Sequence, residues 1–129
     1  KTFVYYIKKR NERVCNMMDK VMTINAYGDI IPCLDFKTRN TSIIGRDIED
    51  VWNFSPELSK FKNILWKDME DGKCLNCKYS ASCFVCMGDN YLETGSLYRV
   101  SERYCANAML LNGFFRSIKE RAEKEKSHG

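Results

Sequence analysis

This sequence has little histidine and no long apolar run, and each of these features excludes some classes of protein. The only histidine is His128, near the end of the chain, so a metal bound here would depend mainly on thiolates. No apolar run approaches the ~20 residues that a membrane-spanning helix needs. Residues 2–7, TFVYYI, are too short for the core of a signal peptide, and no cleavage site of small residues follows them. We therefore expect a cytoplasmic protein without a membrane partner.

Cysteine is abundant, and the number of cysteines argues against a disulfide framework. The chain has 129 residues, of which 44% are hydrophobic and 29% charged, a composition typical of one globular domain. Secreted disulfide frameworks normally use an even number of cysteines and accompany an export signal. Here the cysteines number seven. Metal-bound thiolates in a reducing compartment explain them better.

The net charge is only mildly positive, at +4. Basic residues gather at Lys8–Arg10, and they alternate with glutamates between Lys119 and Lys126. A solvated helix face explains this pattern better than a nucleic-acid surface, so we expect no nucleic-acid partner. A basic nucleic-acid-binding domain, using residues 8–13 and the C-terminal helix, is kept as an alternative.

Four of the cysteines lie within the thirteen residues CLNCKYSASCFVC, residues 74–86. Zinc ribbons separate two C-x2-C pairs by about 15–20 residues, but only five residues separate Cys77 from Cys83. The C-x2-C-x2-C run of bacterial ferredoxins is also absent. The spacing allows two separate metal groups, bound by Cys74, Cys77, Cys83 and Cys105, and by Cys15, Cys33 and Cys86. The alternative is a zinc-binding structural or interaction module that uses Cys74, Cys77, Cys83 and Cys86.

A β-hairpin is predicted between Val21 and Ile31. Along the first strand Val21, Thr23 and Asn25 alternate with Met22, Ile24 and Ala26. Gly28 lies in the turn, where a positive φ is often needed. Cys15 precedes the first strand and Cys33 follows the second, so we expect these two thiols to meet at the same end of the hairpin.

The remaining local patterns predict short helices and loops. Asp47 and Ser55 are typical helix N-caps, and we expect the helix after Ser55 to continue to Gly72. Glycines at both ends of residues 88–95 mark loops, and a further helix is expected from Cys105. Core positions are predicted for Trp52, Phe61 and Trp66. The fold class is therefore a small, loop-rich α+β fold, with a hairpin, short helices and a C-terminal helix arranged around metal clusters.

The order of the cysteines resembles that of the SPASM domain, the C-terminal auxiliary cluster domain of radical S-adenosylmethionine enzymes that modify peptides and proteins. That family has the pattern C-x9–15-G-x4-C, followed by C-x2-C-x5-C-x3-C and a final C. Here twelve residues separate Cys15 from Gly28, and four separate Gly28 from Cys33. The later cysteines match too, except that two residues rather than three separate Cys83 from Cys86.

The resemblance implies two 4Fe–4S clusters. The second would be held by Cys74, Cys77, Cys83 and Cys105. The first would be held by three thiolates and a fourth ligand that the sequence does not identify, the thiolates being Cys15, Cys33 and Cys86. The clusters would serve electron transfer, substrate binding or both.

The resemblance also implies that this chain is one part of a larger enzyme. The family's catalytic motif, C-x3-C-x2-C, does not occur here, so S-adenosylmethionine would be cleaved by an upstream barrel domain. We expect residues 1–14 to lead from that barrel, residues 15–112 to form the cluster domain, and residues 113–129 to form a charged helix and tail. The implied partners are a peptide or protein substrate and an external electron donor.

Overall fold

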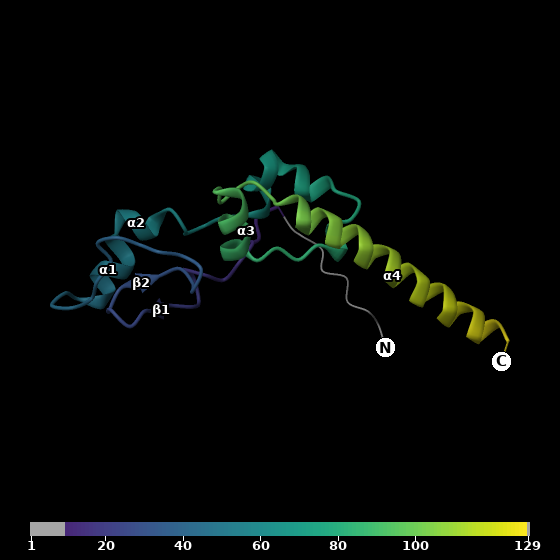
Figure 1. Cartoon of the computed structure of the whole chain (residues 1–129), viewed down its shortest axis with the longest axis horizontal. Helices are drawn as coiled ribbons and strands as arrows, with labels where there is room; N and C mark the ends of the chain where they lie inside the picture. Colours follow the sequence, from purple (N-terminus) through teal and green to yellow (C-terminus); the bar gives the residue numbers. More distant parts are fainter. Residues whose placement is uncertain (1–9, 129) are drawn as a thin grey trace.

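The computed structural model describes residues 10–128 of the chain. The hairpin and two short helices lie at one end, and the last helix extends away at the other (Figure 1). The elements, in chain order, are β1 Thr23–Ile24, β2 Ile30–Ile31, α1 Ile48–Phe54, α2 Pro56–Ser59, the 3-10 segments η1 Trp66–Asn76 and η2 Ser80–Ser82, α3 Met87–Thr94 and α4 Glu102–Ser127. This confirms the α+β, loop-rich fold class. The apolar run at residues 2–7 and the basic pair at residues 8–9 lie outside the described residues.

The predicted hairpin is confirmed, although its strands are short. β1 and β2 pair antiparallel, with Thr23 opposite Ile31 and Ile24 opposite Ile30. Gly28 has a φ of +82° in the turn, and the Asn25 side chain accepts hydrogen bonds from backbone N–H groups within that turn. On its other edge β2 meets a neighbouring loop, where Ile30 donates its N–H to the Thr41 carbonyl.

Both predicted N-caps are confirmed. The Asp47 carboxylate accepts hydrogen bonds from the N–H groups of Glu49 and Asp50, at 2.8 and 3.0 Å, and α1 begins directly after it. Ser55 accepts a hydrogen bond from Leu58 N–H and precedes the proline at the first position of α2. Local side-chain chemistry therefore determines where these two helices begin.

The prediction that the second helix continues to Gly72 was wrong, because α2 ends at Ser59. Downstream of it, Asn63 has a positive φ, which breaks helical geometry. The segment instead pairs with the start of the described chain, where Val14 N–H donates to the Ile64 carbonyl and Trp66 N–H donates to the Glu12 carbonyl, both at 3.0 Å. Long-range backbone pairing thus takes the place of helical hydrogen bonds.

The region between residues 87 and 103 was expected to form loops, but it contains α3. Gly95, with a φ of +69°, is the left-handed residue that ends this helix. Ser101 caps α4, which therefore begins three residues before Cys105. Within the described residues, no helix is long and apolar enough to cross a membrane.

The hydrophobic core lies beneath the hairpin and between the short helices. Phe61 and Trp66 are buried, as predicted, whereas Trp52 is only partly buried at the edge of the core. Phe36 contacts Phe61 at a ring distance of 4.9 Å and Tyr91 of α3 at 5.2 Å, so it connects the segment after the hairpin to both. The core therefore fixes α3 relative to the N-terminal half of the chain.

Candidate metal centre

Four thiols from separate elements converge on one cavity of about 240 Å³. Cys74 lies in η1, Cys77 follows η1, Cys83 follows η2, and Cys105 lies in the first turn of α4. Much of the remaining lining is apolar, including Val100, Ala108 and Met109. The cavity thus offers sulfur donors in a setting with little competition from water.

The pKa values of these thiols reflect their crowding. Burial raises the pKa of Cys74 to about 11, and the neighbouring Cys83 and Cys105 add to the effect. Burial likewise raises the pKa of Cys105, with further contributions from Cys77 and Glu70. The raised pKa values of Cys74 and Cys105 mean that a metal centre binding them as thiolates must release their protons.

The other three cysteines form a second group near the end of the hairpin. Burial raises the pKa of Cys33, and the Asp35 carboxylate, Cys86 and Cys15 raise it further, against a lowering effect of the Asp35 N–H. The Cys33 sulfur lies 3.9 Å from Asp35 Oδ2. The structure therefore brings Cys15, Cys33 and Cys86 near one another, apart from the four-thiol cavity.

This grouping separates Cys86 from the other cysteines of the central stretch. The cavity that Cys74, Cys77 and Cys83 share is completed by Cys105 of α4. Cys86 instead acts on Cys33. The ligand roles of the seven cysteines stay a prediction.

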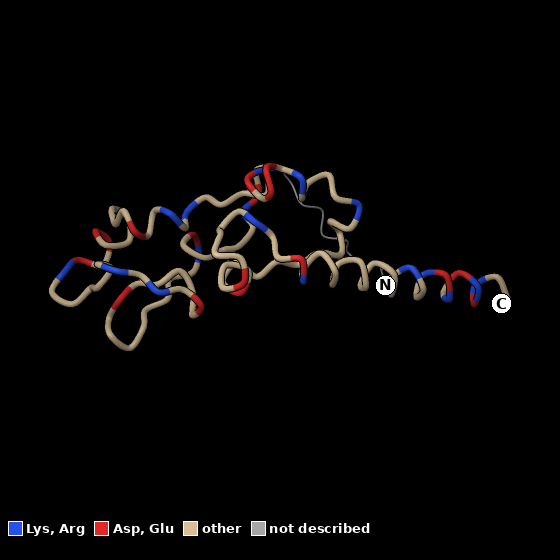
Figure 2. The backbone as a smooth tube through the Cα atoms, turned by 45° about the horizontal axis from the view of Figure 1, so that its top comes forward, with Lys and Arg blue, Asp and Glu red and all other residues tan. Residues whose placement is uncertain are grey.

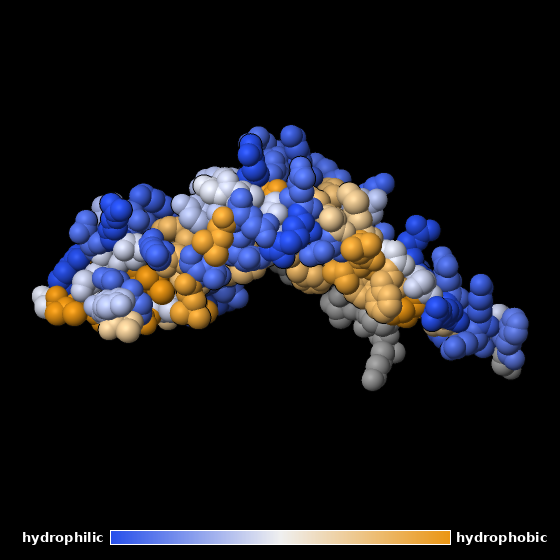
Figure 3. All heavy atoms as spheres, in the orientation of Figure 1, coloured by the Kyte–Doolittle hydropathy of each residue, from blue (hydrophilic) through white to orange (hydrophobic). Residues whose placement is uncertain are grey.

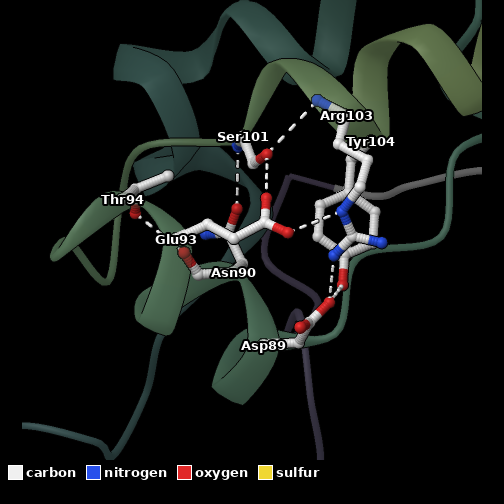
Figure 4. Close-up of polar contacts among 7 residues, drawn as sticks. All are labelled: Asp89, Asn90, Glu93, Thr94, Ser101, Arg103 and Tyr104. Carbon is white, nitrogen blue, oxygen red and sulfur yellow. Dashed lines mark hydrogen bonds and ion pairs between the residues drawn. The ribbon is translucent and has the colours of Figure 1, made fainter.

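A polar network connects α3 to the start of α4 (Figure 4). Asp89 of α3, three residues after Cys86, accepts a hydrogen bond from Tyr104 Oη at 2.7 Å and pairs with Arg103. Arg103 also donates to Glu93 at 2.6 Å. Tyr104 and Arg103 hold the pKa of Asp89 below its usual range. Since Tyr104 directly precedes Cys105, the network fixes the start of α4 against the start of α3.

Asn90 is a fully buried member of this network, with no exposed surface. Its Nδ2 donates to the Arg99 carbonyl at 2.6 Å, and its Oδ1 accepts from Ser101 N–H at 2.8 Å. The sequence analysis missed both Asn90 and Asp89, because their region was expected to be a loop. A helix there would have placed Asp89 and Glu93 on one face, at i and i+4.

Gly88 allows α3 to approach the second cysteine group closely. A Cβ atom built at this position would lie 2.9 Å from the Cys33 sulfur and 2.6 Å from the Asp35 Cβ. A residue with a side chain would therefore collide with the turn that carries Cys33. The glycine, first interpreted as a loop signal, is required here for close packing.

The four-thiol cavity fits a group larger than one ion. Within residues 10–128, no set of three or more His, Cys, Asp or Glu side chains forms a group that could hold a metal ion. The thiols instead surround a volume far above the roughly 10–15 Å³ that one water occupies. Thiolate donors around an apolar space of this size suit an iron–sulfur cluster.

Comparisons with known proteins agree with this chemistry. No curated protein and no solved structure matches the chain. One family model matches residues 15–78, that of SPASM, described as an iron–sulfur cluster-binding domain. The matched range includes Cys15, Cys33, Cys74 and Cys77, and the other three cysteines follow it. Through this segment the chain belongs to the SPASM family, whose domains bind iron–sulfur clusters.

Proposed function

We propose that this chain is the auxiliary cluster-binding part of a radical S-adenosylmethionine enzyme that modifies a peptide or protein. The observation that carries the proposal is the convergence of Cys74, Cys77, Cys83 and Cys105 on one cavity. These four thiolates would hold one 4Fe–4S cluster. Cys15, Cys33 and Cys86 would hold another, with one further ligand. Such clusters supply one-electron transfer, and an iron with an open position can bind substrate.

The protein's own residues prepare this chemistry in two ways. The cavity has an apolar part to its lining, and burial and hydrogen bonding around sulfur tune a cluster's potential. The hydrogen bonds and ion pairs of Asp89, Tyr104 and Arg103 fix the distance between the two thiol groups. A fixed separation favours electron exchange between the sites and with an external donor.

An apolar surface on α4 supports the proposed association with a further domain. Leu110 and Phe114 are 73% and 59% exposed, and Met109 lies beside them. The hydrophobic colour along the middle of this helix shows the surface (Figure 3). Exposed apolar patches of this kind mark interaction surfaces. The upstream barrel, where S-adenosylmethionine would be cleaved, is the partner that we propose.

The alternative functions have less support. A zinc module would need Cys86 beside Cys74, Cys77 and Cys83, but Cys86 lies with the other group. A nucleic-acid surface would need a continuous basic stripe, whereas the end of α4 shows both charge signs interleaved (Figure 2). Lys119 there lies 4.0 Å from Glu123.

Anaerobic reconstitution of the full chain with iron and sulfide tests the proposal. We expect up to about eight irons per chain and the brown absorption of iron–sulfur clusters. Changing Cys15 and Cys33 to Ala should remove about half the iron, whereas changing Cys74 and Cys105 should be far more disruptive. Ser59→Ala, on the exposed surface of α2, is the control. Stoichiometric zinc without charge-transfer absorption would refute the cluster, and equal losses in both double variants would refute the two ligand sets.

A further inference from the structure

Glu70 joins the two segments that deliver cysteines to the four-thiol cavity. Its backbone N–H donates to the Tyr98 carbonyl at 2.8 Å. Its carboxylate accepts a hydrogen bond from Val100 N–H at 2.7 Å. Glu70 lies four residues before Cys74, and Val100 lies five residues before Cys105. Glu70 therefore both donates and accepts a hydrogen bond between two chain segments that are about thirty positions apart.

The backbone at this contact is strained. Glu70, Asp71 and Gly72 have φ values of 48°, 54° and 81°, so three successive residues are left-handed inside η1. This conformation is disfavoured for the two residues that have a Cβ, and it persists only where surrounding contacts impose it. The turn redirects the chain so that Cys74 faces the start of α4. The two hydrogen bonds of Glu70 hold this turn against the opposite segment.

We propose that Glu70 is a positioning residue for a cluster in the four-thiol cavity, setting the separation of Cys74 and Cys105 and placing a negative charge beside them. This inference rests on the proposed cluster-binding function. It assigns a role to a residue outside the cysteine pattern. Val100 lines the same cavity, so the hydrogen bond from Val100 to Glu70 positions the cavity wall as well as the cysteines.

The carboxylate has two separable roles, mechanical and electrostatic. As an acceptor it holds Val100 N–H, and the amide oxygen of glutamine can do the same. As a charge it is held against the N–H of Val100, which lines the same cavity as Cys74 and Cys105. A nearby negative charge opposes the addition of an electron to a cluster, so its removal should raise the reduction potential. Glu70→Gln should keep the first role and lose the second, whereas Glu70→Ala should lose both.

The test compares Glu70→Ala, Glu70→Gln and wild type in the full chain, reconstituted anaerobically with iron and sulfide. Iron retention against a chelator measures the mechanical role, and a redox titration measures the electrostatic one. We expect Glu70→Ala to retain iron about 10- to 100-fold less well, the range typical for residues that support metal ligands. Glu70→Gln should retain iron nearly as well as wild type, but with a more positive reduction potential.

Glu57→Gln is the matched control, because Glu57 pairs with Lys60 on α2 and does not line the cysteine cavity. It should match wild type in both measurements. Should Glu70→Ala fail to fold, Glu70→Gln still decides the matter, since an unchanged potential would overturn the proposal. Wild-type retention in Glu70→Ala would overturn it too. A wild-type chain that takes up no iron would instead overturn the cluster-binding function itself, and the role of Glu70 with it.

Discussion

Replacing Gly88 with alanine is expected to disturb the three-cysteine group specifically. A Cβ at this position would lie 2.5 Å from Asp35 Oδ2, 2.6 Å from Asp35 Cβ and 2.9 Å from Cys33 Sγ. Carbon atoms in favourable contact are about 3.5–4.0 Å apart. The carboxylate oxygen and the Cys33 sulfur could rotate away, but the Asp35 Cβ moves only with the backbone turn. Either α3 or that turn must therefore shift.

The size of the effect follows from two opposing contributions. Overpacking of this kind costs about 1–3 kcal/mol of unfolding free energy. Alanine is intrinsically better than glycine within a helix by up to about 1 kcal/mol. We therefore expect a net loss of up to about 2 kcal/mol. If the turn moves instead, Cys33 moves with it, and iron bound by the three-cysteine group should be lost.

Gly113→Ala provides the control, because a Cβ built at Gly113 in α4 meets nothing within 4 Å. This variant should gain up to about 1 kcal/mol from helix propensity and keep all its iron. The assay is the urea midpoint of each reconstituted variant together with its iron content per chain. Equal midpoints and equal iron in the two variants would refute the reasoning from close packing.

Two further predictions concern other parts of the site. Asn90→Ala should remove a fully buried amide and leave the buried Ser101 N–H without its partner, which costs about 1–3 kcal/mol in urea unfolding, and the carbonyl of the exposed Arg99 loses a hydrogen bond as well. A wild-type midpoint would contradict this. In the folded metal-free chain, Cys74 should react slowly with iodoacetamide, because the thiolate is the reactive form and its pKa is raised to about 11. Mass spectrometry should show its rate rising about tenfold per pH unit from about pH 8 to 10; a plateau near pH 9 would contradict the raised pKa.

The sequence predicted those parts of the fold that depend on neighbouring residues. Asp47 and Ser55 cap helices with side chains that reach only two or three positions along the chain. Gly28 takes the positive φ that its turn needs. Such signals are complete within a short window, so local rules suffice.

Long-range contacts determine the parts of the fold that were not predicted from the sequence. The apolar spacing after Ser55 is compatible with a helix, but residues 64–66 pair with residues 12–14 instead. Gly88 lies inside α3 at a point where Cys33 and Asp35 leave no room for a Cβ, and neither residue is near it in sequence. Propensity is only a weak guide where such tertiary contacts compete with it.

The candidate site likewise contains residues that the sequence pointed to and residues that depend on long-range contacts. Cysteine spacing allowed two sets of thiols, and the resemblance to the SPASM domain implied the same two; the structure places four thiols on one cavity and Cys33 close enough to Cys15 and Cys86 to be affected by both. The residues that hold those sets in place, Glu70, Asp89 and Asn90, are ordinary polar residues in sequence. Their roles depend on partners ten to thirty positions away, which no local pattern reveals.

Because α4 starts at the four-thiol cavity, it can act as a long lever. Cys105 lies in its first turn, and Lys126 is near its last residue. At 1.5 Å per residue the two are about 32 Å apart. A tilt of about 10° at the cavity would displace the charged tip by about 5–6 Å, by the same helical geometry. Sub-ångström adjustments of the Cys105 backbone would thus be amplified at the far end of the helix.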